Sequence, residues 1–261
     1  MNYIKSLFDV ITSYVTPGII KLSPNIKVIK AGIFNHDLPI WQIVENENYP
    51  KTRDKLLGHA SFKTGLQYTI DFIRNKSVSS NFNKVLVITA ERVEDINCDV
   101  DYDCFDLVIG TSNIGLDLGA HKHAMEYFCK EYSKNTTGIL VLSNSSFRPK
   151  PYCFSMNFLS LTSLSKAMLG VSFGYGPRYY LFKEYHLQSF FLASNIQFMY
   201  EIFSRINLNT NNKYYVIRNG ELKITSSVYG KGGISVCYDS SNFFIADHLK
   251  RQIKFYDHRL N

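Results

Sequence analysis

The sequence lacks the features that mark membrane-spanning, secreted and zinc-stabilised proteins. No apolar run reaches the ~18 residues that a membrane span requires, and the N-terminus does not show the basic, apolar and small-residue order of a signal peptide. The five cysteines are odd in number and show no CxxC spacing, which argues against a disulfide framework and against structural zinc. We therefore expect a cytoplasmic protein with reduced thiols.

The common signatures of nucleotide and hydrolase sites are also missing. The sequence contains no P-loop, no GxGxxG and no nucleophile elbow. The acidic run 99–103 resembles a DxD motif or the start of an EF-hand, but Cys104 and Gly110 stand where an EF-hand needs Gly and Glu. His121 and His123 are two apart on a predicted helix and point to different faces, so no shared metal is expected there.

The composition is typical of one large domain that binds an anionic partner. A chain of 261 residues can bury about three quarters of its unfolded surface. The 29 basic and 22 acidic side chains give a net charge of +7, which suits nucleoside diphosphates, lipid phosphates or nucleic acid. The basic residues are scattered and are not interleaved with aromatics on one element, so nucleic acid is the least expected partner.

Hydrophobic periodicity predicts an α/β fold with a mostly parallel central sheet. The predicted strands are 27–34, 84–89, 107–109, 138–142 and 168–173. The predicted helices are 61–74, 120–132 and 186–206. A polar linker is expected around 45–58, and Asn219-Gly220 predicts a hairpin over 214–226.

The two ends of the chain are expected to flank a core domain. We place an amphipathic helix over 2–15, a strand and a linker in residues 1–58, the core in 59–247 and a basic tail in 248–261. The helix packs on the domain or lies on a membrane surface, and the tail is a solvated basic face or a patch for lipid phosphates. If the helix lies on a membrane or the tail binds lipid phosphates, the protein would contact the inner face of the membrane.

Residues 107–146 carry the most information about function. Two predicted buried strands each end in a polar cluster, and open α/β sheets bind ligands at the carboxyl ends of their strands. In the first cluster, Gly115 and Gly119 flank Asp117, which either accepts hydrogen bonds from a sugar or ribose hydroxyl or caps the following helix. The second cluster adds the cations Arg148 and Lys150 to a turn that contains prolines.

Five segments of the chain resemble one protein family when taken in order. They are Asn113-x-Gly115-x-Asp117-x-Gly119-Ala120 before a helix, Asn144-Ser145-Ser146 after a strand, Leu169-Gly170, 185–192 (YHLQSFFL), and Val216-Ile217 with Glu221. This order resembles the rhamnan synthesis protein F family of bacterial glycosyltransferases, over about residues 60–240. The resemblance implies a single GT-A-like, Rossmann-like nucleotide-sugar domain that acts in surface polysaccharide assembly.

The resemblance also implies roles for individual residues. Either His186 or Glu221 would be the catalytic base that takes the proton of the acceptor hydroxyl. For residues 186–192 an ordinary core helix remains the alternative, and for Glu221 a surface position in a hairpin. The donor-binding residues would be Asn113, Gly115, Asp117, Gly119, Asn144, Ser145, Ser146, Gln188 and Ser189. To these the charge of the chain itself adds Arg148 and Lys150, which could bind the diphosphate.

The sequence departs from the family pattern at the place of the acidic motif. Ser145 stands where the family usually has Asp, and Arg148-Pro149 stands where it has Gly-Pro. Without the carboxylate, Mg²⁺ or Mn²⁺ loses its main ligand, whereas Arg148 and Lys150 can neutralise a diphosphate directly. We therefore expect no cofactor and favour metal-independent transfer, with Mg²⁺ or Mn²⁺ as the alternative.

The expected activity is transfer of a sugar, such as the deoxyhexose rhamnose, from a nucleotide-diphosphate donor to a hydroxyl of a surface glycan or a lipid-linked acceptor. Two other classes remain open. One is a different nucleotide-using α/β enzyme, such as a methyltransferase, whose Gly-rich loop would be expected after the first strand. The other is a GT-A-like protein that binds anionic ligands without catalysing transfer, which Ser145 makes conceivable.

Overall fold

The computed structural model describes most of the chain between residues 26 and 245. The N-terminal helix expected over 2–15 and the basic tail expected over 248–261 lie outside the described residues. So does most of the acidic run 99–103. The described residues are 26–32, 34–35, 37–57, 60–75, 80–97, 102–132, 138–155, 159–163, 166–171, 173–174, 186–239 and 242–245.

A nine-stranded mixed sheet forms the centre of the protein, with the strand order β1-β6-β5-β2-β7-β11-β8-β12-β13. Two small antiparallel pairs, β3–β4 and β9–β10, lie outside this sheet. The strands of the large sheet are β1 (Ile26–Lys30), β2 (Ile40–Asn46), β5 (Asn83–Ala90), β6 (Leu107–Ser112), β7 (Ile139–Asn144), β8 (Ala167–Gly170), β11 (Phe191–Asn195), β12 (Ile234–Asp239) and β13 (Asn242–Ile245). The strands of the small pairs are β3 (Arg53–Leu57), β4 (Ala60–Thr64), β9 (Phe173–Gly174) and β10 (His186–Leu187).

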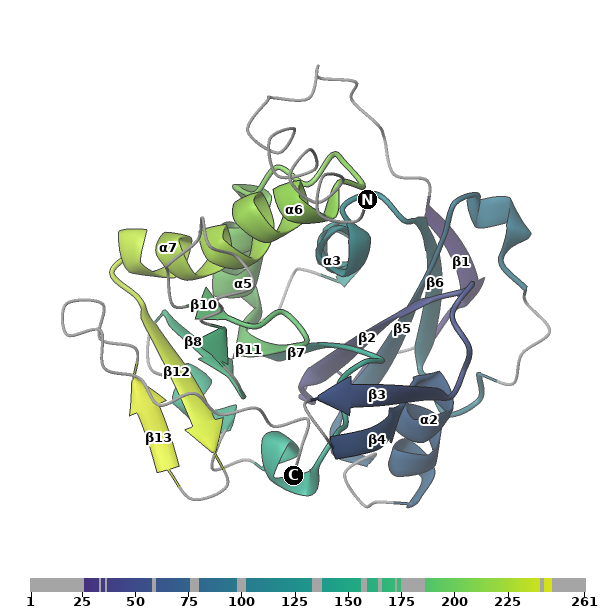
Figure 1. The fold of residues 1–261 in the computed structure, drawn as a ribbon, viewed down its shortest axis with the longest axis horizontal. Coiled ribbons are helices and arrows are strands. Elements are labelled where there is room, and N and C mark those ends of the chain that lie inside the picture. The colour runs from purple at the N-terminus through teal and green to yellow at the C-terminus, as the bar shows by residue number, and fades with distance from the viewer. Residues whose placement is uncertain are drawn as a thin grey trace.

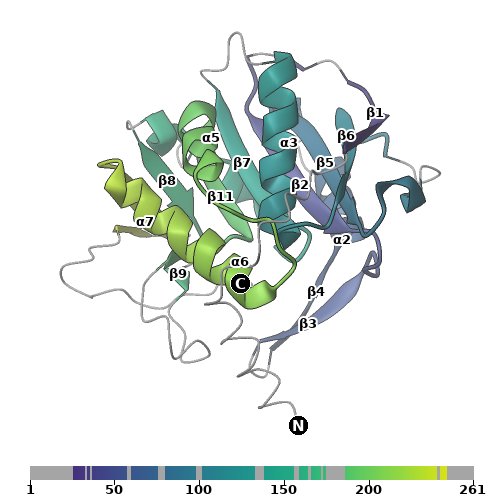
Figure 2. The same ribbon diagram turned by 90° about the horizontal axis from the view of Figure 1, so that it is seen from above.

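Helices cover both faces of the sheet and make the fold a three-layer α/β structure (Figure 1). Helix α2 packs on one face, and α3, α5, α6 and α7 pack on the other (Figures 1 and 2). Each face has its own apolar core, built from alternating side chains of the same strands. The helical segments are α2 (Leu66–Asn75), α3 (Leu116–Tyr132), α5 (Ile196–Ser204), α6 (Lys213–Val216), the π-helical turn η7 (Ile217–Glu221) and α7 (Leu222–Gly230), with short 3-10 turns at Val93–Asp95, Pro151–Phe154 and Ser160–Ser163.

The half of the sheet that contains β6, β5, β2 and β7 is entirely parallel. The chain passes from β2 to β5 through α2 on one face, and from β6 to β7 through α3 on the other. The crossovers therefore diverge between β2 and β7. In open α/β sheets this point of divergence leaves a crevice at the carboxyl ends of the two strands, and ligands bind there.

The other half of the sheet contains antiparallel strands, whereas a mostly parallel sheet was expected. Strand β11 is antiparallel to both β7 and β8, β12 is parallel to β8, and the edge strands β1 and β13 are antiparallel to their neighbours. The sheet is mixed because β11 enters its middle from the opposite direction. The architecture is α/β and is compatible with a Rossmann-like fold.

The prediction of one long helix over 186–206 is wrong. This stretch forms β10, a turn, the central strand β11 and then the shorter helix α5. The helix begins where the Asn195 side chain accepts hydrogen bonds from the amides of Gln197 and Phe198. A short apolar run fits a buried strand as well as a buried helix, so periodicity alone did not separate the two.

The hairpin predicted around Asn219-Gly220 is also wrong, because residues 213–230 are helical throughout. Asn219 lies in the π-helical turn, where its side-chain amide donates to the carbonyl oxygen of Tyr215. Gly220 packs closely on α3, since a Cβ there would lie 2.5 Å from Leu118 Cδ1. The C-terminal hairpin that does exist is β12–β13, further along the chain.

Three predictions near the start of the core also needed correction. The strand expected over 27–34 ends at Lys30 and lies antiparallel at the sheet edge. The central strand β2 was not predicted, and the supposed linker over 45–58 contains the end of β2 and all of β3. The helix expected from residue 61 begins at Leu66, after β4. The predicted strands at 84–89, 107–109 and 138–142 are confirmed as β5, β6 and β7, and the strand predicted over 168–173 is confirmed in part as β8, which ends at Gly170.

None of the helices in the described part of the chain is both long and apolar enough to cross a bilayer.

Candidate functional site

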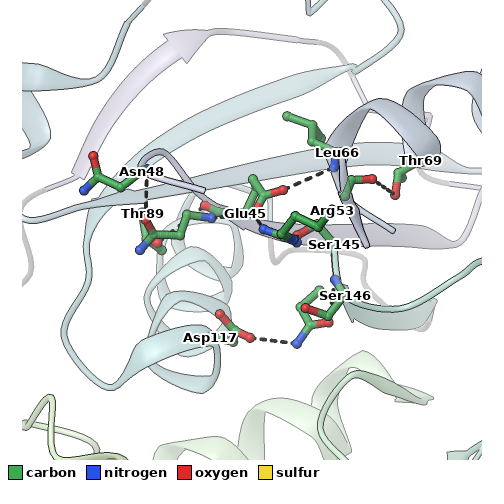
Figure 3. A network of polar contacts seen from close by, with 12 residues as sticks. Glu45, Asn48, Arg53, Leu66, Thr69, Thr89, Asp117, Ser145 and Ser146 are labelled. Atoms are coloured by element: carbon green, nitrogen blue, oxygen red, sulfur yellow. Dashed lines mark hydrogen bonds and ion pairs between the residues drawn. The ribbon is translucent and has the colours of Figure 1, made fainter. Parts of the chain in front are cut away.

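Several of the polar residues singled out in the sequence lie together at the carboxyl ends of β2 and β7, a region that we call the crevice. Asn144 is the last residue of β7, and Ser145 and Ser146 follow it directly. Asp117 reaches the same place from the first turn of α3 (Figure 3). Figure 2 shows β3, β4 and α6 at this end of the molecule. The predicted cluster is therefore assembled from both sides of the topological switch point.

The loop that leads into α3 has an unusual backbone. Gly115 and Leu116 both have positive φ, 76° and 55°, and a residue with a side chain rarely adopts this conformation. The Gly115 amide donates to the carbonyl oxygen of Thr210, and a Cβ at Gly119 would lie 1.8 Å from the Ile114 carbonyl oxygen. The two glycines thus let the loop turn sharply and pack closely. Helix α3 begins at Leu116, earlier than the predicted Ala120, so Asp117 lies within its first turn.

Asp117 is held by Asn144. The Asn144 side-chain amide donates to Asp117 Oδ2 at 2.7 Å, while Asn144 Oδ1 accepts from the amide of Ser146 at 3.1 Å. Burial raises the pKa of Asp117, with further contributions from the negative charges of Glu45 and Glu221, whereas the Asn144 hydrogen bond and Arg53 lower it. Asp117 therefore accepts a hydrogen bond from Asn144 and lies among other charged groups.

Sequence reasoning missed a second polar network at the end of β2. Glu45 Oε1 accepts from Arg53 Nη1 and from the Asn46 amide, both at 2.9 Å, and Oε2 accepts from the Leu66 amide at 3.2 Å. Arg53 also donates to Ser145 Oγ, which joins this network to β7 (Figure 3). Neither residue belongs to a motif, and the hairpin that carries Arg53 was read as a linker. Only the fold brings them to the crevice.

The Glu45 carboxylate occupies the N-terminus of α2. In mononucleotide-binding α/β proteins, the helix that follows the first strand of the parallel half offers its free amides to phosphate. Here β2 is that first strand, and the Leu66 amide is already paired with Glu45. The Gly65 amide is likewise paired, with the Ser145 carbonyl oxygen at 2.8 Å. A phosphate at this crevice must therefore be bound by other groups.

Glu221 lies on the α3 side of the crevice in contact with two polar side chains. His186 Nε2 is 3.6 Å from Glu221 Oε2, and Ser189 Oγ donates to Glu221 Oε1 at 2.5 Å. Burial would raise the pKa of Glu221, but the hydrogen bond and charge of His186, the Ser189 hydroxyl and the charge of Lys213 together lower it. Glu221 is therefore an ionised carboxylate that orients His186.

The remaining predicted residues lie around this centre. Arg148 Nε donates to the Tyr68 hydroxyl at 2.9 Å, and the guanidinium lies 5.3 Å from the centre of the Tyr68 ring. Burial and the charge of Arg148 lower the pKa of Lys150. These two cations thus lie near the first turn of α2. Asn113 and Gln188 are partly buried in the loops after β6 and β10.

Among the described residues, no group of three or more His, Cys, Asp or Glu side chains is arranged to hold a metal ion. His121 and His123 contact different partners, since His121 Nδ1 lies 2.8 Å from Gln42 Nε2 and His123 Nδ1 lies 3.3 Å from Thr111 Oγ1.

The arrangement combines three chemical capacities. The Asp117 carboxylate can accept hydrogen bonds from hydroxyl groups, and the Glu221–His186 pair can accept a proton. The cationic side chains nearby can bind an anion. No protein-family profile matches the chain, and no curated protein is significantly similar to it. The functional argument consequently rests on this geometry.

Proposed function

We propose that this protein is a glycosyltransferase of GT-A-like organisation, which transfers a sugar from a nucleotide-diphosphate donor to a hydroxyl of a glycan or lipid-linked acceptor. The observation that carries the proposal is the convergence of Asp117, Ser145 and the His186–Glu221 pair at the switch point of a Rossmann-like sheet. These residues come from separate segments of the chain, and no packing requirement explains why so many charged groups meet in one crevice.

Asp117 binds hydroxyl groups of the sugar donor. Asn144 holds one carboxylate oxygen of Asp117, and a ribose or sugar hydroxyl donates to the other. Such charge-assisted hydrogen bonds contribute roughly 1.5–3 kcal/mol each. The positive φ of Leu116 supports a binding role, because strained backbone clusters at ligand-binding loops.

His186 takes the proton of the acceptor hydroxyl. A carboxylate with a lowered pKa is a poor proton acceptor near neutral pH, so Glu221 orients the imidazole and stabilises its positive charge. The Ser189 hydroxyl keeps the other oxygen of Glu221 occupied. A π-helical turn ends at Glu221, and single π-turns occur frequently at functional sites. In this proposal His186 is the base and Glu221 is the residue that positions it.

The position of the glycine-rich loop argues against a methyltransferase-like enzyme. That class is expected to carry the loop after the first strand of the parallel half, whereas Gly115 and Gly119 follow β6, the outermost strand of that half. The loop after β2 instead leads into the β3–β4 hairpin.

A binding screen followed by a transfer assay tests the proposal. Nucleoside diphosphates and their sugars are added to the full chain, and the melting temperature is measured, because a ligand of the native state raises it by mass action. Compounds that raise it are then tested for sugar transfer to hydroxyl acceptors. Asp117→Asn should abolish the shift, while the matched control Asp95→Asn, at an exposed carboxylate, should preserve it. If no nucleotide sugar shifts the wild-type protein, the proposal is wrong.

A further inference from the structure

We propose that Arg53, on the β3–β4 hairpin, is the group that binds the diphosphate of the donor, with the Thr64 hydroxyl beside it. This inference rests on the function proposed above and names the cation within that site. Arg53 reaches the crevice from a segment in which the sequence predicted no structure, and it contacts Glu45 and Ser145 at the ends of both strands that border the crevice.

Two buried polar atoms on cross-strand partners of the β3–β4 hairpin lack a hydrogen-bond partner. Arg53 Nε and Thr64 Oγ1 are both fully buried, and neither has a hydrogen-bond partner among the described residues. Arg53 and Thr64 are directly opposed in the register of β3 and β4, so their side chains lie on one face of the hairpin about 5 Å apart at Cβ. An unsatisfied buried donor destabilises the native state. An oxyanion bound at this face of the hairpin would satisfy the donor and the hydroxyl together.

The guanidinium keeps binding capacity after its contacts with the protein are made. It has five N–H groups, of which the Glu45 and Ser145 contacts use one each at Nη1 and Nη2. The Tyr49 ring lies 4.9 Å from its carbon and fixes its plane. An oriented guanidinium with free N–H groups is the geometry that binds phosphate through two parallel hydrogen bonds.

Arg53 shares the carboxylate of Glu45 with two backbone amides. Its two oxygens also accept from the amides of Asn46 and Leu66, and the second amide lies at the positive end of α2. The carboxylate is thus stabilised by the backbone as well as by Arg53. Because Glu45 pairs with the Leu66 amide, that end of the helix is closed to phosphate, and Arg53 is the cation that contacts the ends of both strands.

Titration with inorganic pyrophosphate tests this inference directly. Isothermal titration of the full chain is carried out in EDTA, with wild type, Arg53→Lys, Thr64→Val and the control Arg92→Lys, at an exposed arginine of a surface pair. Lysine retains a positive charge for Glu45 but lacks the planar fork, and valine replaces the hydroxyl with a methyl of similar size. We expect Arg53→Lys to weaken pyrophosphate binding at least tenfold, Thr64→Val to weaken it several-fold, and Arg92→Lys to leave it unchanged.

The possible results separate the inference from the proposed function. Equal pyrophosphate affinity in wild type, Arg53→Lys and Thr64→Val would overturn the inference, as would a wild-type protein that does not bind pyrophosphate, even if a nucleotide sugar is transferred. Loss of pyrophosphate binding in Arg53→Lys, in a protein that binds no nucleotide sugar, would support the anion site and overturn the glycosyltransferase proposal. Thr64→Val provides an independent test if Arg53→Lys does not fold.

Discussion

Gly220 packs directly against Leu118, the residue that follows Asp117. A Cβ at Gly220 would lie 2.5 Å from Leu118 Cδ1 and 3.2 Å from Leu208 Cδ2. This close approach sets the π-helical turn against the start of α3, and it places Glu221 near enough to Asp117 for the two charges to interact. The spacing of the two carboxylates in the crevice therefore depends on a residue that has no side chain.

We expect Gly220→Ala to lower both stability and transfer. The added methyl group must push the π-helical turn away from Leu118, and overpacking of this kind costs roughly 1–3 kcal/mol. The free energy of unfolding in urea and the rate of sugar transfer measure the two effects. Gly230→Ala is the matched control, because a Cβ there meets nothing within 4 Å. An unchanged transfer rate in Gly220→Ala would show that the spacing of the carboxylates does not matter.

Donor binding should depend on the ionisation of Asp117. Burial raises the pKa of this carboxyl above its ordinary value of 3.8, and only the ionised form accepts a hydroxyl hydrogen bond at both oxygens. Affinity is therefore expected to fall as the pH is lowered through a midpoint above 3.8. Titration of wild type and Asp117→Asn over a pH series measures this. The acid-dependent loss should be absent in Asp117→Asn, whose residual binding is at least tenfold weaker.

Two buried histidines should make the protein sensitive to acid. Burial lowers the pKa of His121 to about 3 and that of His123 to about 4, with Lys122 adding to the effect at His123. Below pH 6.5 the unfolded chain binds protons that the native state does not bind, so stability falls as the pH drops from about 6.5 toward 4. Each histidine contributes roughly 1.4 kcal/mol per pH unit in that range.

Urea unfolding at pH 7, 6 and 5 measures this slope. In His121→Asn, the shorter amide removes the titrating group, and its oxygen is an acceptor for the Gln42 side chain that now contacts His121. The variant should lose stability on acidification less steeply than wild type. Equal slopes in the two proteins would contradict a neutral, buried His121.

Transfer should survive chelation of divalent metal ions. Ser145 supplies a hydroxyl where a carboxylate ligand would be needed, and the cations near the crevice include Arg53, Arg148 and Lys150. The rate of transfer is measured after dialysis against EDTA and again after Mn²⁺ is added. Activity that disappears on chelation and returns with Mn²⁺ would show that an acidic ligand binds the metal.

Local sequence determined the α/β class, strands β5 to β8 and the helix that contains Asp117. Buried parallel strands are short continuous apolar runs, and a glycine-spaced acidic residue before a helix marks a strand-to-helix turn. These signals depend on neighbouring residues alone. For the same reason the sequence predicted that Asp117 and the cluster 144–146 would meet, since parallel strands end at the same edge of a sheet.

Tertiary structure alone decided the rest of the site. Phe191–Asn195 became a strand because β7 and β8 supply hydrogen-bonding edges on both sides of it, and Asn219-Gly220 lies in a helical segment that packs Gly220 against Leu118. Arg53 and Glu45 meet only when β2 occupies the centre of the sheet and the hairpin folds over its end. Pairings between residues far apart in the chain leave no periodic trace in sequence, so the position of Arg53 followed only from the folded structure.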